Sequence, residues 1–150
     1  MCDMAEHDVR IASFDDLEQH TAYRLWQLRE SVFVVEQACP YAELDGRDLE
    51  PNTKHLWVEY DGAPTAYLRI LEDPGVARIG RVLVAKPWRS RGVADVLVRR
   101  ALHEVGNRPS RLDAQVYLAD WYARFGFEVA GAEFLEDGIP HVPMTRNARD

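Results

Sequence analysis

The chain has little cysteine, with only Cys2 and Cys39 among its 150 residues. Two distant cysteines do not make a disulfide framework, and neither has the spacing of a structural zinc site. We therefore expect no metal site. No apolar run approaches the ~20 residues that cross a bilayer. The N-terminus is polar and acidic, unlike a signal peptide. We expect a cytoplasmic protein without a membrane partner.

Positive charge is also scarce, since 18 Lys and Arg residues stand against 25 Asp and Glu residues, a formal net charge of −7. Such an acidic surface excludes nucleic-acid binding over the whole molecule. A single basic cluster in such a chain favours a small anionic ligand at that cluster. The excess of acidic residues favours an amine partner elsewhere on the protein. The length suits a single domain, residues 1–150, with its own core.

The stretch from Val82 to Leu102 predicts a strand, a basic turn and a helix, because an apolar β-branched run is followed by an apolar pattern of helical period. We expect Ser90 to be the helix N-cap. Flanking arginines oppose the helix dipole there, and Gly92 in a first turn costs about 1 kcal/mol relative to alanine. A bound anion would resolve both conflicts. The alternative is an exposed basic loop with an ordinary serine cap.

The other patterns predict a mixed sheet with helices packed on it, in the α/β or α+β class. An Asp61–Gly62 hairpin turn joins two strands of an antiparallel meander. The strand after the second helix is expected to return parallel, through a right-handed crossover. Expected strands are Val9–Phe14, His55–Tyr60, Pro64–Leu71, Val76–Ala85, Leu112–Tyr117, Phe127–Leu135 and Ile139–Arg146; expected helices are Asp15 to about Val34, Ser90 to Gly106, and Leu118–Phe125; Asn147–Asp150 is expected to be a frayed tail.

An acidic segment precedes the second strand and contains Glu43, Asp45, Asp48 and Glu50, interrupted by Arg47. Two interpretations stay open. Charge runs are usually solvated surface. Alternatively, the segment forms one wall of a substrate site that attracts an amine.

Two motifs carry a resemblance to a known family. Arg89-x-x-Gly92-x-Ala94 after a Val-Leu-Val strand resembles the acetyl-CoA pyrophosphate signature of the GNAT N-acetyltransferase superfamily. Ala119-x-x-Tyr122-x-x-x-Gly126–Phe127 resembles a second motif of that family, in the right order and at the right distance. The segments 32–41 and 136–141 resemble its ElaA-like branch, and the similarity runs from about Val9 to Arg146.

The resemblance implies a GNAT fold, here a mixed, mostly antiparallel twisted sheet of about seven strands with helices on both faces. It implies transfer of an acetyl group from acetyl-CoA to a primary amine of a small molecule or protein, by direct attack in a ternary complex. It also implies the residues that hold the cofactor. These are Val82, Leu83 and Val84 for the pantetheine arm, Arg89, Ser90, Arg91, Gly92, Val93 and Ala94 for the pyrophosphate, and Gln115 where the family usually has asparagine.

The catalytic acid that the resemblance implies is Tyr122, protonating the departing thiolate. The alternative is a core aromatic, because Tyr122 shares helical spacing with its apolar neighbours. The base has two candidates. His141 has a suitable ordinary pKa of about 6.5, but it is also a plausible half-buried strand residue. Glu36 is the other, and its alternative is a surface carboxylate at a helix end. Deprotonation through water without a dedicated base is a third possibility.

Three other functions stay open at this point. The chain is alternatively a non-catalytic acyl-CoA-binding regulatory module of the same fold, a transferase for a longer acyl chain, or a binder of a nucleotide or sugar phosphate at the same basic turn. The protein is expected to be a monomer or a homodimer.

Overall fold

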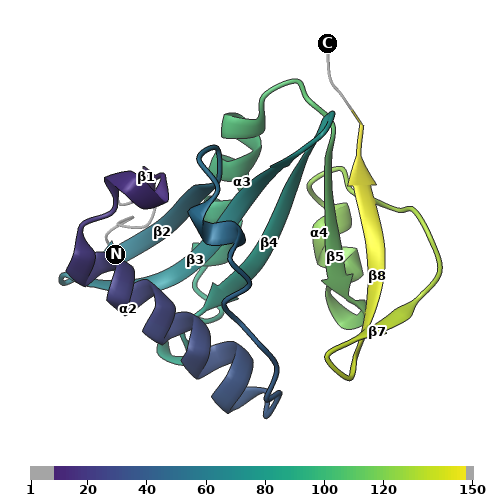
Figure 1. Ribbon diagram of the computed structural model, residues 1–150. Helices are drawn as coiled ribbons and strands as arrows, with labels where there is room; N and C mark the ends of the chain where they lie inside the picture. Colours follow the sequence, from purple (N-terminus) through teal and green to yellow (C-terminus); the bar gives the residue numbers. More distant parts are fainter. Residues whose placement is uncertain (1–8, 148–150) are drawn as a thin grey trace.

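The computed structural model describes residues 9–147 and builds them around one sheet (Figure 1). Within these residues eight strands pair in the order β1-β2-β3-β4-β5-β8-β6, with β7 also on β8. The strands are β1 (Val9–Ala12), β2 (Lys54–Tyr60), β3 (Ala63–Asp73), β4 (Val76–Val84), β5 (Ser110–Gln115), β6 (Glu128–Val129), β7 (Phe134–Glu136) and β8 (Ile139–Arg146). The α-helices are α2 (Gln19–Arg29), α3 (Val93–Val105) and α4 (Ala119–Ala123). Cys2 and the last three residues of the predicted tail lie outside the described residues.

The predicted topology is confirmed. Strands β2, β3 and β4 form the antiparallel meander. Asp61 and Gly62 join the first two with φ values of 54° and 78°, as a mirror-image hairpin turn requires. Strand β5 follows α3 and lies parallel to β4.

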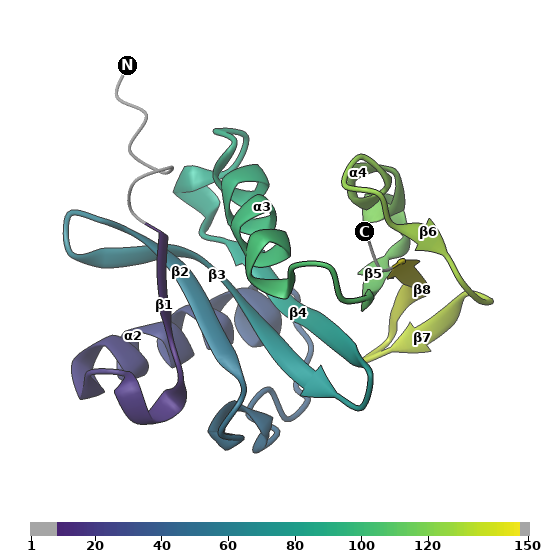
Figure 2. The same ribbon diagram turned by 90° about the horizontal axis from the view of Figure 1, so that it is seen from above.

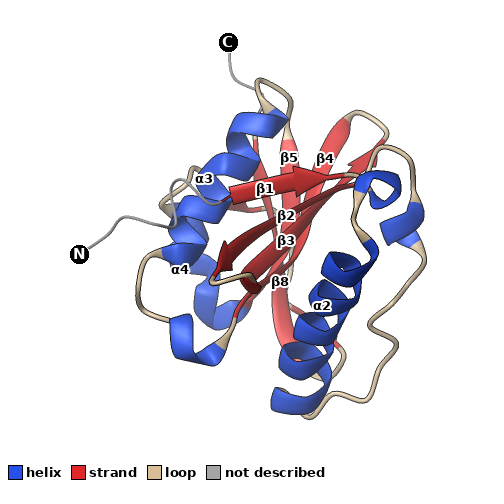
Figure 3. Cartoon of the chain, turned by 90° about the vertical axis from the view of Figure 1, so that its left-hand side faces the viewer, coloured by secondary structure: helices blue, strands red, loops and turns tan. Residues whose placement is uncertain are grey.

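Helices cover both faces of the sheet, as expected. Helix α2 lies on one face, and α3 and α4 lie on the other (Figures 2 and 3). Each face buries its own core. The α2 side contains Leu25, Val32, Trp57, Tyr67 and Leu83. The larger α3 and α4 side includes Leu68, Ile79, Leu97, Val98, Tyr122 and Phe127. Among the described residues no helix is long and apolar enough to cross a membrane.

The first helix begins later than predicted. Phe14–Asp16 form a separate 3-10 turn, and α2 starts at Gln19. The carboxylate of Glu18 accepts a hydrogen bond from the Thr21 amide at 2.9 Å, so Glu18 is the cap rather than an aspartate upstream. After Arg29 the helix widens to a π-helix over Glu30–Glu36. Such wide turns are often found at functional sites.

The start of α3 also differs from the prediction. Gly92, not Ser90, is the N-cap, with φ 78° and no side-chain capping bond. Glycine adopts this left-handed conformation without a steric cost. The expected penalty for glycine inside a first turn therefore does not arise. Gly106 ends the helix, as predicted.

Two predicted strands are wrong in extent. The expected strand Phe127–Leu135 is split into β6 and β7, which pair with successive parts of β8. A Cβ on Gly131 between them would lie 2.8 Å from Cγ of Pro143, so this close approach to β8 requires glycine. Strand β5 ends at Gln115, because Val116–Leu118 turn into a 3-10 helix that leads into α4.

Candidate active site

The site lies where the sheet opens. Strands β4 and β5 are in register only at Ala77 with Ser110 and at Arg78 with Arg111, and they then separate (Figure 1). Two hollows adjoin this opening. We call the hollow of about 720 Å³ the large groove, and the hollow of about 120 Å³ the small cavity. Both are lined by Phe33, Gln37, Val82, Gln115, Leu118 and Tyr122.

The large groove brings together nine of the ten residues predicted to hold the cofactor. These are Val82, Leu83, Val84, Arg89, Ser90, Gly92, Val93, Ala94 and Gln115. Arg91 does not line the groove, since its guanidinium lies over the Trp88 ring, 5.0 Å from the centroid. The volume falls within the usual range for small-molecule sites.

One end of the groove is suited to an anion. The first amides of α3 have no side-chain cap, because Gly92 is the N-cap. A Cβ on Gly92 would meet nothing within 4 Å, so this approach to the backbone is open. Unpaired amides at the start of a 13-residue helix bind anions well. This end of the groove is therefore suited to an anionic group such as a diphosphate.

Arg89 and Glu36 form an ion pair in the wall of the groove. Nη1 and Nη2 of Arg89 donate to the two carboxylate oxygens at 2.6 and 2.9 Å. Nε of Arg89 donates to the Val84 carbonyl at 2.9 Å. The hydrogen bonds from Arg89 hold the pKa of Glu36 below its ordinary value. A carboxylate so stabilised is poorly suited to accept a proton near neutral pH.

Tyr122 lies on the wall that the groove and the cavity share. It is 6% exposed, and its ring packs edge-to-face with Trp121 and Phe127. Its hydroxyl has no hydrogen-bond partner in the described part of the chain, and burial raises its pKa. Tyr122 is thus a packed aromatic residue that also borders both hollows.

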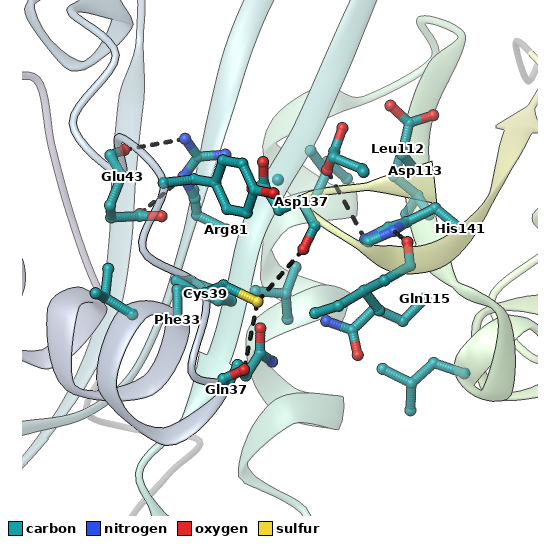
Figure 4. Close-up of a pocket in the computed structure, with 18 of the residues that line it drawn as sticks. Phe33, Gln37, Cys39, Glu43, Arg81, Leu112, Asp113, Gln115, Asp137 and His141 are labelled. Carbon is teal, nitrogen blue, oxygen red and sulfur yellow. Dashed lines mark hydrogen bonds and ion pairs between the residues drawn. The ribbon is translucent and has the colours of Figure 1, made fainter. Parts of the chain in front are cut away.

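His141 lies in the small cavity (Figure 4). It is 7% exposed, and it stands opposite Gln115 in the β5–β8 register. Its Nδ1 lies 2.7 Å from the Ile139 carbonyl. A carbonyl only accepts, so Nδ1 carries the hydrogen of the neutral ring and Nε2 carries the lone pair. The nearest charged atom to Nε2 is a Glu136 oxygen at 3.8 Å, beyond hydrogen-bond distance.

The acidic segment is neither a solvated loop nor a free acidic wall. Three of its carboxylates are bound by arginines from other elements, in pairs between Glu43 and Arg29, Glu43 and Arg81, Asp45 and Arg69, Asp48 and Arg29, and Asp48 and Arg69. Glu50 pairs with Arg47 of the same segment. Glu43 does line the small cavity, but two guanidinium groups neutralise it. The sequence interpretation missed this network because the arginines lie 14 or more residues from most of their partners.

Known proteins resemble this chain over most of its length. Residues 15–148 match the family described as Acetyltransferase (GNAT) domain. The chain is 52% identical over 136 residues to a UPF0039 protein of Mycobacterium tuberculosis, covering 87% of each. The crystal structure of an acyl-CoA N-acyltransferase from Pseudomonas aeruginosa matches with a TM-score of 0.89 and 41% identity, covering 93% of this chain and 98% of that one. Escherichia coli ElaA matches with a TM-score of 0.89 and 35% identity, covering 93% and 99%.

Proposed function

Because the chain belongs to the GNAT acetyltransferase family, we propose that it transfers the acetyl group of acetyl-CoA to a primary amine of a small molecule or protein. Its similarity to ElaA confirms the predicted branch. The reaction is direct attack in a ternary complex, with Tyr122 as the acid. The supporting observation is Tyr122, which lines both the large groove and the small cavity and whose hydroxyl has no hydrogen-bond partner among the described residues.

The large groove is the proposed cofactor site. Acetyl-CoA supplies the acyl group already activated as a thioester. The amides after Gly92 hold its diphosphate, and the edge of β4 at Val82–Val84 lies along the pantetheine arm. Orientation by these backbone groups brings the reacting carbon next to the small cavity, which converts a bimolecular encounter into a reaction within one complex.

His141 is the proposed base. His141 lines the small cavity, its Nδ1 hydrogen is fixed by the Ile139 carbonyl, and its Nε2 carries the lone pair. A neutral imidazole accepts a proton from an ammonium group at neutral pH far better than an arginine-bound carboxylate does. Glu36 is therefore not the base in this proposal, and its carboxylate pairs with Arg89, which phosphate would otherwise bind.

Tyr122 acts on the other side of the reaction. A phenol whose pKa is raised by burial stays protonated throughout the neutral range, so its hydrogen is present when negative charge develops on sulfur. The hydroxyl donates a hydrogen bond to the departing sulfur and passes its proton as the bond to carbon breaks.

The small cavity is the proposed amine site. At about 120 Å³ it admits an amino group on a short unbranched arm, not a bulky ring system. The cavity wall includes Glu136 and Asp137 at the β7–β8 turn. Within residues 9–147 no arginine or lysine forms an ion pair with either carboxylate. These two groups, rather than the acidic segment, favour a cationic acceptor.

The test is release of free CoA from acetyl-CoA in the presence of 1,4-diaminobutane, L-lysine or a capped lysine peptide. The wild-type protein is expected to release CoA only when an amine is added. Tyr122→Phe should keep its affinity for acetyl-CoA but release CoA at least about 100-fold more slowly. Tyr23→Phe is the matched control, since Tyr23 is 70% exposed on α2.

Each alternative function has its own outcome in this assay. Binding of acetyl-CoA without release of CoA for any amine would identify a non-catalytic acyl-CoA-binding module. Faster turnover of a longer acyl-CoA would identify a different acyl donor. Displacement of acetyl-CoA by ATP at equal concentration would identify a nucleotide site at the basic turn.

A further inference from the structure

Strand β4 contains a β-bulge at the junction of the two hollows. Tyr67 pairs with Leu83 and Arg69 pairs with Gly80, so the two residues Arg81 and Val82 stand opposite the single residue Leu68. Val82 lines both the groove and the cavity. On the other side of β4, strand β5 no longer pairs with β4 at the position of the bulge.

Arg81 has an unusual backbone conformation in this bulge. Its φ is +55°, in the left-handed region that residues with a side chain rarely adopt. Such a conformation persists only where the surroundings hold it. The side chain of Arg81 shows what holds it. Its Nε donates to Oε2 of Glu43 at 2.8 Å, and its Nη2 donates to the Glu43 carbonyl at 3.0 Å (Figure 4).

Glu43 is itself fixed from the opposite side by Arg29. Nε of Arg29 donates to the same carboxylate oxygen at 2.8 Å, and Nη2 donates to the same carbonyl at 3.2 Å. The Arg29 side chain is fully buried, and it lies at the residue where α2 becomes the π-helix. Glu43 therefore joins the end of α2 to the bulge of β4.

A larger ion cluster supports this link. It consists of Arg29, Glu43, Asp45, Asp48, Arg69 and Arg81, with equal numbers of positive and negative groups. Arg69 donates to Asp45 at 2.6 and 2.9 Å and to Asp48 at 3.0 Å. Because its charges balance, the cluster contributes little net field to the adjacent cavity. Its structural effect is to fix four segments relative to one another, namely α2, the acidic segment, β3 and β4.

We propose that Glu43 is a positioning residue for the acetyl transfer, and that it acts through Arg81. Its carboxylate, held by Arg29, keeps Arg81 in the left-handed conformation, and this conformation sets the bulge so that one of its amides faces the thioester oxygen. A fixed amide at that place stabilises negative charge on the oxygen as the amine attacks. This inference rests on the proposed function, since it assumes acetyl-CoA in the large groove.

The test uses the binding of acetyl-CoA labelled with ¹³C at the thioester carbonyl. An amide donor lowers the infrared stretching frequency of that carbonyl, so the bound band of the wild-type protein should lie below that of free acetyl-CoA. In Arg81→Ala and Glu43→Gln the bound band should return toward the free position. In Arg47→Ala it should stay at the wild-type position, because Arg47 pairs with Glu50 and Asp73 and lines neither hollow.

Kinetics give the second readout. With 1,4-diaminobutane as acceptor, Arg81→Ala and Glu43→Gln should lower kcat by about 10- to 100-fold, as small misplacements of reacting groups do. The KM for acetyl-CoA should change by less than about threefold, since the diphosphate contacts stay in place. Arg81→Lys should recover part of the lost kcat. Arg81→Gly removes the same guanidinium without the Cβ clash, so it should lose less kcat than Arg81→Ala, and Arg81→Ala serves if Glu43→Gln does not fold.

The outcomes separate this inference from the proposed function. A folded Arg81→Ala protein with wild-type kcat and an unmoved carbonyl band would overturn the inference and leave the function intact. An equal loss of kcat in Arg47→Ala would also overturn it. A wild-type protein that binds acetyl-CoA but acetylates no amine would overturn the proposed function, and the carbonyl band alone would then decide the inference.

Discussion

Replacing Arg81 by glycine and by alanine gives the sharpest prediction for stability. Both variants remove the guanidinium that binds Glu43, so the loss of this contact is common to the pair. They differ in the backbone, because Arg81 has a φ of +55°. Without the Glu43 contact, alanine either keeps the left-handed conformation against its Cβ clash or gives up the bulge, whereas glycine keeps the conformation at no steric cost. The usual order, in which alanine is the more stable residue in regular structure, should therefore be reversed.

The size of the difference follows from two opposing terms. Relief of the left-handed strain favours glycine by about 1–2 kcal/mol. The extra backbone freedom of glycine in the unfolded chain costs about 0.5–1 kcal/mol. The glycine variant should be more stable by about 1 kcal/mol, which for a chain of 150 residues corresponds to about 2–4 °C in Tm. The Arg81 side chain is 25% exposed, so both variants are expected to fold.

Urea unfolding of the two variants, followed by circular dichroism, measures this difference directly. Equal slopes of the unfolding free energy against urea would show that the two native states are equally compact. A higher unfolding free energy for Arg81→Ala than for Arg81→Gly would refute the reasoning, because it would mean that residue 81 is not held in the left-handed conformation in solution.

Three further predictions concern single residues. Glu36→Gln should bind acetyl-CoA about 3- to 10-fold more tightly in calorimetry, because Arg89 is released to bind phosphate and a negative charge leaves the groove; weaker binding would contradict this. Gly92→Ala should lower the Tm and the affinity for acetyl-CoA, since its φ is +78° at the anion end; unchanged affinity would argue against a diphosphate there. Burial lowers the pKa of His55 in the folded state. The unfolded chain therefore binds a proton at His55 more readily than the folded chain does. The free energy of unfolding should thus be highest above pH ~6.5 and should decrease as the pH falls below this value. His55→Gln should flatten this dependence in urea titrations at several pH values, and an equally steep fall in the variant would assign it to other groups.

The framework of the site was predictable because its signals are local. The apolar run at Val82–Val84, the helical period that follows and the aromatic residue of the second motif all lie within short windows. The start of α3 was not resolved in the same way. Ser90 and Gly92 are both common at helix N-termini, and only the observed φ of Gly92 shows which residue ends the turn.

The ion cluster was not predictable from local patterns. Arg29 binds Asp48, 19 residues away, and Arg81 binds Glu43, 38 residues away. The acidic segment alone is compatible with a solvated loop or with a substrate wall. Only tertiary contacts show that its carboxylates are neutralised by arginines. The proposed attraction for an amine therefore rests on Glu136 and Asp137 instead.

The π-helix and the β4 bulge were missed for a different reason. Residues 30–36 keep the hydrophobic pattern of a helix, and residues 76–84 keep that of a strand. Both irregularities change the backbone hydrogen bonding and leave the apolar content unchanged. Arg91 is a separate case. Its place in the motif predicts a contact with the cofactor, and this stays a prediction, while its side chain lies over Trp88.

The structure of the protein bound to CoA would test the central claim most directly. The measured quantity is the distance from the Tyr122 hydroxyl oxygen to the CoA sulfur. The account predicts that the diphosphate lies against the amides that follow Gly92 and that the sulfur lies within hydrogen-bond reach of Tyr122, about 3–4 Å. CoA bound elsewhere, or a sulfur out of reach of that hydroxyl, would contradict it.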